Sequence, residues 1–112
     1  MLTIDRLNEF GADTKTGIKR CAGNEALYLR LVGMVPINTS FNNLYEAIKN
    51  NNLSEAFNNA HALKGILANL SLDPLLKPVV EITEHLRNKD EIDYSNLINV
   101  IEENRKKLEV LI

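Results

Sequence analysis

The chain has 112 residues but no tryptophan, three prolines and a single cysteine. One thiol, Cys21, cannot form an internal disulfide, which favours a reducing compartment such as the cytoplasm; Cys21 itself is interpreted as a small buried apolar residue. No apolar run approaches the roughly 20 residues of a membrane span, and the first residues lack the basic-then-apolar layout of a signal peptide. We therefore expect a cytoplasmic protein with no membrane partner.

An excess of positive charge is also lacking, since the net charge is −2. Nucleic-acid binding needs a clustered cationic surface, whereas lysine and arginine are spread along this chain. The tightest cluster, Arg105-Lys106-Lys107, is interpreted as a solvated helix face in a late turn, where cations complement the helix dipole. The two histidines and the lone cysteine show no metal-ligand spacing. We expect neither a nucleic-acid partner nor a metal site.

Strand signals are absent, and apolar residues recur at helical spacing. An N-terminal stretch with Asp13 or Thr14 as a cap predicts one or two short helices. Longer helices are expected from Asn24 to before Pro36, around 41–48, from Asn52 to Leu70, from Asp73 as N-cap with Pro74 at the first helical position, and from near Asp93 onward. We expect an all-α fold, an antiparallel four-helix bundle with additional short N-terminal helices, forming one domain over residues 1–112.

His61 lies in the middle of the longest predicted helix, on the solvent side of its apolar stripe. Gly65 and Ala68 fall within roughly 40° of His61 around the helix axis, so the surface beside the imidazole carries little bulk. Lys64, three residues on, reaches the same neighbourhood. The predicted stripe consists of Leu53, Phe57, Ala60, Leu63, Leu67 and Leu70.

Gly65 is the informative residue of this helix, because an internal glycine costs about 1 kcal/mol relative to alanine. Close approach of another surface to His61 would explain the glycine. An exposed imidazole, a nearby cation and a cleared patch suit phosphoryl transfer to histidine, in which a neutral ring nitrogen attacks phosphorus. Lys64 would offset charge on the equatorial oxygens. Without Gly65, the histidine and lysine would be interpreted as ordinary surface residues.

The string His61-Ala62-Leu63-Lys64-Gly65, followed by Ala68-Asn69-Leu70, closely resembles the signature of histidine-phosphotransfer (HPt) domains. In coarse form the resemblance covers nearly the whole chain. Residues similar to the family's N-terminal stretch are Gly17, Arg20, Gly23, Asn24, Leu27 and Tyr28, and those similar to the helix before the histidine helix are Leu44, Ala47 and Ile48. The chain departs from the family pattern at Ile66, Leu67, Ser71 and Pro78, which affects packing but leaves the phosphoacceptor intact.

The resemblance implies that His61 accepts a phosphoryl group from the aspartate of one response-regulator receiver domain and passes it to another, downstream of a histidine kinase. Lys64 would orient or neutralise the phosphoryl group, and Gly65 would provide clearance. Family members do not bind ATP or phosphorylate themselves, and no Gly-rich phosphate loop is present. We thus expect no cofactor and no kinase activity of its own. The expected docking surface of this monomer consists of Asn58, Ala62, Gly65 and Ala68.

Two alternatives stay open. The chain could be the phosphoacceptor domain of a chemotaxis-type histidine kinase, although a start at Met1 favours the stand-alone form. It could also be a non-catalytic bundle that binds receivers, against which Gly65 and an intact Lys64 count. Of the remaining polar residues, Asn69 is interpreted as structural and His85, beside Glu84 and Arg87, as an ordinary exposed histidine.

Overall fold

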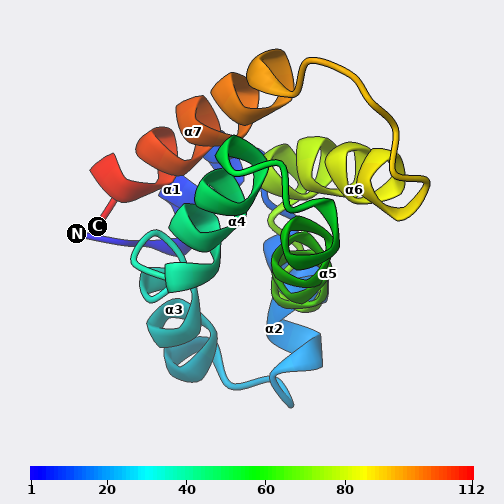
Figure 1. Cartoon of the computed structure of the whole chain (residues 1–112). Coiled ribbons are helices and arrows are strands. Elements are labelled where there is room, and N and C mark those ends of the chain that lie inside the picture. Colours follow the sequence, from blue (N-terminus) through cyan, green and yellow to red (C-terminus); the bar gives the residue numbers. More distant parts are fainter.

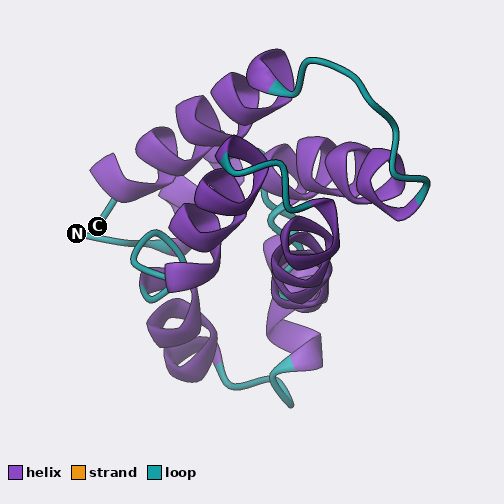
Figure 2. Cartoon of the chain, viewed as in Figure 1, coloured by secondary structure: helices purple, strands orange, loops and turns teal.

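The computed structural model describes residues 1–112 and contains seven helices and no strand, which confirms the all-α prediction (Figures 1 and 2). None of these helices combines the length and the apolar character that crossing a membrane requires. The helices are α1 (Ile4–Phe10), α2 (Thr14–Arg20), α3 (Glu25–Gly33), α4 (Thr39–Lys49), α5 (Leu53–Asn69), α6 (Asp73–Arg87) and α7 (Ser95–Val110).

Polar side chains fix where several helices begin. The first N–H groups of a helix have no partner within it, and an aspartate or asparagine oxygen at the N-cap accepts one of them. The predicted caps Asp13, Asn24 and Asn52 are confirmed in this role. The bonds run from the N–H of Thr16 to Asp13 (3.2 Å), from that of Leu27 to Asn24 (3.0 Å) and from that of Glu55 to Asn52 (3.1 Å).

The start of α6 differs from the prediction by one residue. Leu72 is the N-cap, so Asp73 and Pro74 lie in the first turn instead of at the cap and the first position. Leu72 is fully buried, and its carbonyl accepts the N–H groups of Leu75 and Leu76. No side chain caps this helix, although Asp73 was predicted to do so. Farther on, Pro78 does not interrupt the helix.

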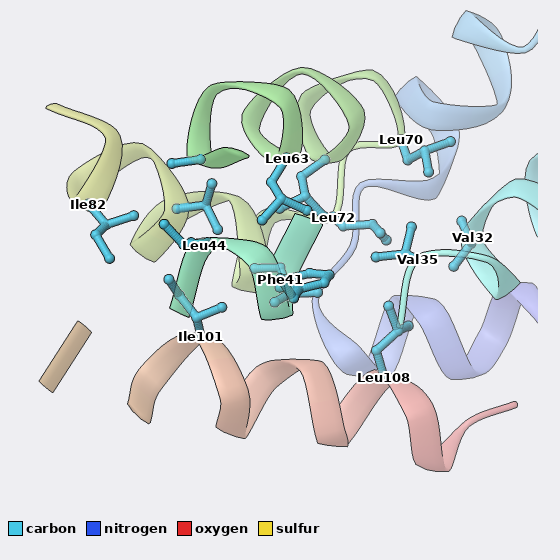
Figure 3. Packing of buried hydrophobic residues seen from close by; sticks show 14 of the residues in the cluster. Val32, Val35, Phe41, Leu44, Leu63, Leu70, Leu72, Ile82, Ile101 and Leu108 are labelled. Carbon is cyan, nitrogen blue, oxygen red and sulfur yellow. The ribbon is translucent and has the colours of Figure 1, made fainter. Parts of the chain in front are cut away.

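The four longest helices pack in succession along the chain. Helix α4 packs against α5, α5 against α6, and α6 against α7. Their buried apolar side chains form one cluster, which also contains Cys21 and the N-terminal Leu7 and Tyr28. Figure 3 shows the core side chains of the four helices pointing inward, among them Phe41 and Leu44 of α4, Leu63 of α5, Ile82 of α6, and Ile101 and Leu108 of α7. Removing these surfaces from water is the main stabilisation of the fold.

The N-terminal helices fasten the C-terminal end of α5. The hydroxyl of Tyr28 donates a hydrogen bond to the carbonyl of Leu70 (2.9 Å), and the guanidinium of Arg20 donates one to the carbonyl of Ala68. These carbonyls belong to the last turn, where intrahelical donors run out. Gly17 makes the approach possible, because a Cβ there would lie 2.3 Å from the Tyr28 ring. Gly17, Arg20 and Tyr28 therefore hold the end of the helix that carries His61.

Ser71, just beyond α5, adopts the left-handed backbone conformation with φ of 54°. The N–H of Leu72 donates to the carbonyl of Leu67 (3.0 Å), which closes the helix end in the manner that usually places glycine at the left-handed residue. Ser71 therefore occupies a strained backbone conformation.

Candidate functional site

His61 is exposed in the middle of α5, on the side of the helix away from the core, where periodicity predicts it. Its neighbours Ala60 and Leu63 are fully buried and hold the helix against α4 and α6. The position of the imidazole on the surface thus follows from the burial of the opposite face. A nucleophile at this position is accessible to another macromolecule.

The buried stripe of α5 differs from the predicted one at its N-terminal end. Ala56 is fully buried, whereas Leu53 and Phe57 are only half-buried. Ala56 precedes Ala60 by four residues and therefore lies on the same line along the helix. Phe57 is displaced around the helix toward His61, which it precedes by four residues.

Phe57 and His61 stack on one another, with ring centroids 5.6 Å apart and an interplanar angle of 23°. The guanidinium carbon of Arg87, the last residue of α6, lies 5.0 Å from the centroid of the Phe57 ring. Arg87 is paired in turn with Glu84, at 3.4 Å between Nε and Oε2. Helical periodicity predicts Phe57 in the core, and no sequence pattern predicts a role for Arg87. The spacing of four residues between the two rings was the only local signal of the stack.

Gly65 is exposed one turn beyond His61, and a Cβ built on it would meet no atom within 4 Å. Its backbone angles are ordinary for a helix, since only Gly11 and Gly23 among the glycines have positive φ. Neither packing nor backbone conformation within the protein therefore requires glycine here. Gly17 is the contrast, because there the fold itself excludes a side chain.

The other predicted site residues lie on either flank of His61 along α5. Asn58 and Ala62 are exposed, while Lys64 and Ala68 are half-buried. Lys64 takes part in none of the ion pairs of the protein, so its ammonium group is not neutralised by a carboxylate. An exposed imidazole, an unpaired cation and several small side chains therefore lie within three turns of one helix.

A shallow apolar groove of about 260 Å³ lies between α3 and α5 on the Ala62 side of this surface. Asn69 lines the groove; it is exposed and its side chain makes no hydrogen bond, which differs from the structural role expected for it. Met34, on the α3 side, is 56% exposed. The residues lining the groove are Leu31, Met34, Val35, Asn38, Ile66, Asn69 and Leu70.

His85 is not the ordinary exposed histidine that its neighbours suggested. Its Nδ1 lies 2.8 Å from Oδ2 of Asp90, and the N–H of Asp90 donates to the carbonyl of His85 (3.0 Å). These two bonds fasten the loop that leaves α6. His85 and Asp90 belong to no cluster of three or more histidine, cysteine or acidic side chains that could hold a metal ion.

Chemically, the His61 surface offers a nucleophilic nitrogen, a cation within one turn, and open space above Gly65. Comparisons with protein-family models, with curated proteins and with solved structures found no match. The function is accordingly inferred from these residues and their geometry.

Proposed function

We propose that this protein is a histidine phosphotransfer protein of a two-component phosphorelay, in which His61 accepts a phosphoryl group from a receiver-domain aspartate and passes it to another receiver. The observation that carries the proposal is the exposed glycine beside an exposed histidine. Glycine costs helix stability, and nothing inside the protein needs it at position 65. Glycine at position 65 is explained if the surface of another protein must come into contact with the imidazole.

The reaction requires only groups that the two partners carry. The lone pair of the unprotonated His61 nitrogen attacks phosphorus while the bond from phosphorus to the aspartyl oxygen breaks. The carboxylate leaves with the electron pair, and the proton on the second ring nitrogen stays in place during the transfer. The aspartate of the next receiver reverses the step by attacking the phosphohistidine.

Lys64 would act on the charge of the transferred group. It follows His61 by three residues and has no competing carboxylate. Its ammonium group can approach the equatorial phosphoryl oxygens, where most catalysis of phosphoryl transfer acts. Water screens a half-buried cation, so the effect of Lys64 on the transfer rate should be smaller than the roughly 100-fold that a fully preorganised donor supplies.

Receivers would dock on the small side chains around His61, namely Asn58, Ala62, Gly65 and Ala68. A carrier must release its partner after each transfer, so the interface should be small and transient. We further propose a cytoplasmic monomer, supplied with phosphate by an upstream histidine kinase.

The proposed fold of this carrier is an antiparallel four-helix bundle of α4 to α7, with α1 to α3 at its side and end. The packing of α4 on α5, of α5 on α6 and of α6 on α7 supports this arrangement, because consecutive helices are neighbours in an up-and-down bundle. Between α4 and α7, the hydroxyl of Tyr45 donates to Glu102 (2.8 Å) and the guanidinium of Arg105 donates to the carbonyl of Pro36 (2.8 Å), just before α4. These bonds join the first and last helices of the proposed bundle.

The test is transfer of labelled phosphate from a panel of purified receiver domains, each phosphorylated beforehand with labelled acetyl phosphate. Wild-type protein and the control His85→Gln should become labelled, and His61→Gln should not. The label should survive alkali and be lost in acid, as expected of phosphohistidine. Lys64→Gln should be labelled more slowly, by less than the roughly 100-fold that loss of a preorganised donor costs.

Label on His61→Gln, or no label from any receiver in the panel, would refute the proposal. Receiver binding without transfer would instead support the non-catalytic bundle. The His85→Gln control is matched in residue type, and His85 lies in the last turn of a different helix, α6.

A further inference from the structure

The ring of His61 does not stand alone on the surface of α5. One face of it stacks on Phe57, which is half-buried and packs against the core. We propose that Phe57 is a positioning residue that holds the imidazole in the orientation for phosphoryl transfer. This inference rests on the proposed function of His61.

The chemical reason is that transfer needs a nitrogen lone pair aligned with the bond that breaks. An exposed histidine side chain otherwise moves among several rotamers, each of which aims its nitrogens differently. Alignment of reacting groups is a large part of enzymatic rate enhancement. The stack fixes the plane of the imidazole through its face, whereas both ring nitrogens lie at the edge and stay free for attack or proton exchange.

Phe57 is itself held in place from α6. Arg87 lies over its ring at 5.0 Å from the centroid, and Glu84 pairs with Arg87 at 3.4 Å. Cation–π contact of this kind favours one position of both side chains. The orientation of the imidazole on α5 thus depends on a neighbouring helix, which a contact within α5 alone would not achieve.

The contribution of Phe57 is distinct from simple burial. A leucine at position 57 would still cover the core but would present no flat face to the imidazole. An aromatic pair is more stable than its buried area alone explains. The extra stability corresponds to a roughly 2- to 12-fold higher ratio of stacked to unstacked orientations of the His61 ring. The loss of transfer rate in Phe57→Leu should fall in the same range of roughly 2- to 12-fold.

The experiment compares wild type, Phe57→Leu and Phe57→Tyr by proton NMR of the His61 ring and by single-turnover transfer from a phosphorylated receiver. In the wild type, ring current from Phe57 should shift the carbon-bound His61 protons upfield. Phe57→Leu should abolish that shift and lower the maximal transfer rate, with the half-saturating receiver concentration unchanged. Phe57→Tyr keeps the ring and should restore both, which also guards against a leucine variant that folds poorly.

The outcomes separate the two proposals. A wild type that acquires no label overturns the phosphotransfer function and the positioning role with it. A labelled wild type whose transfer rate is unchanged in Phe57→Leu overturns positioning alone. A change confined to the half-saturating concentration also overturns it, because Phe57 would then serve docking.

Discussion

Gly65 should show opposite effects on stability and on phosphotransfer. The substitutions are Gly65→Ala, which adds one methyl group, and Gly65→Gln, which adds a long uncharged side chain. Because a Cβ at this position meets nothing within 4 Å, neither substitution is expected to strain the folded protein.

The magnitude follows from helix propensity. Replacing an internal glycine by alanine should raise the free energy of unfolding by about 1 kcal/mol, and glutamine should raise it by about 0.5 kcal/mol. For a chain of 112 residues, the alanine effect corresponds to an increase of about 4 °C in Tm. The rate of phosphotransfer should fall in both variants, and it should fall more for glutamine than for alanine. A side chain that displaces the incoming phosphorus by about 1 Å can lower the rate roughly 100-fold. Gly65→Gln should approach that loss, and Gly65→Ala should lose less.

Urea denaturation measures the first effect, and transfer from a labelled receiver measures the second. Gly33→Ala is the matched control: Gly33 also lies in a helix, α3, and a Cβ there also meets nothing within 4 Å. Gly33→Ala should raise the free energy of unfolding by less than Gly65→Ala, because Gly33 is the last residue of its helix. It should leave the rate of phosphotransfer unchanged. If Gly65→Ala destabilises the protein, or Gly65→Gln transfers phosphate at the wild-type rate, the clearance role of Gly65 is refuted.

Two further predictions concern the end of α5 and the helices that hold it. Ser71→Gly should raise the free energy of unfolding by about 1 kcal/mol in urea denaturation, because glycine adopts the left-handed conformation without the Cβ penalty; a destabilised variant would contradict this. Burial raises the pKa of Tyr28 from 10.0 to about 12. The neutral hydroxyl therefore contributes fully to the free energy of unfolding below pH 10, and this contribution is lost as the pH rises toward 12. Tyr28→Phe should lower the free energy of unfolding at pH 7 by about 1–3 kcal/mol, because the carbonyl of Leu70 loses its hydrogen-bond donor. Between pH 10 and 12, the stability of this variant should decline less steeply than that of the wild type.

The sequence was sufficient for features that depend on neighbours along the chain. Asn24 and Asn52 cap their helices through bonds to residues three positions away, so their roles could be read directly. The exposure of His61 followed from the periodicity of a single helix. The absence of a side chain at Gly65 is a property of the sequence, and the structure adds that no internal contact requires it.

Only the tertiary structure decided which side chains of different helices meet. The stack of Phe57 on His61 depends on one helix, but Arg87 reaches it because α6 packs against α5. The link between Tyr28 and Leu70 similarly depends on how α3 meets the end of α5. Helix α6 begins after the buried Leu72 and has no polar side-chain cap. Local periodicity fixes which face of a helix is buried, whereas the packing of the whole core selects the neighbour that each face receives.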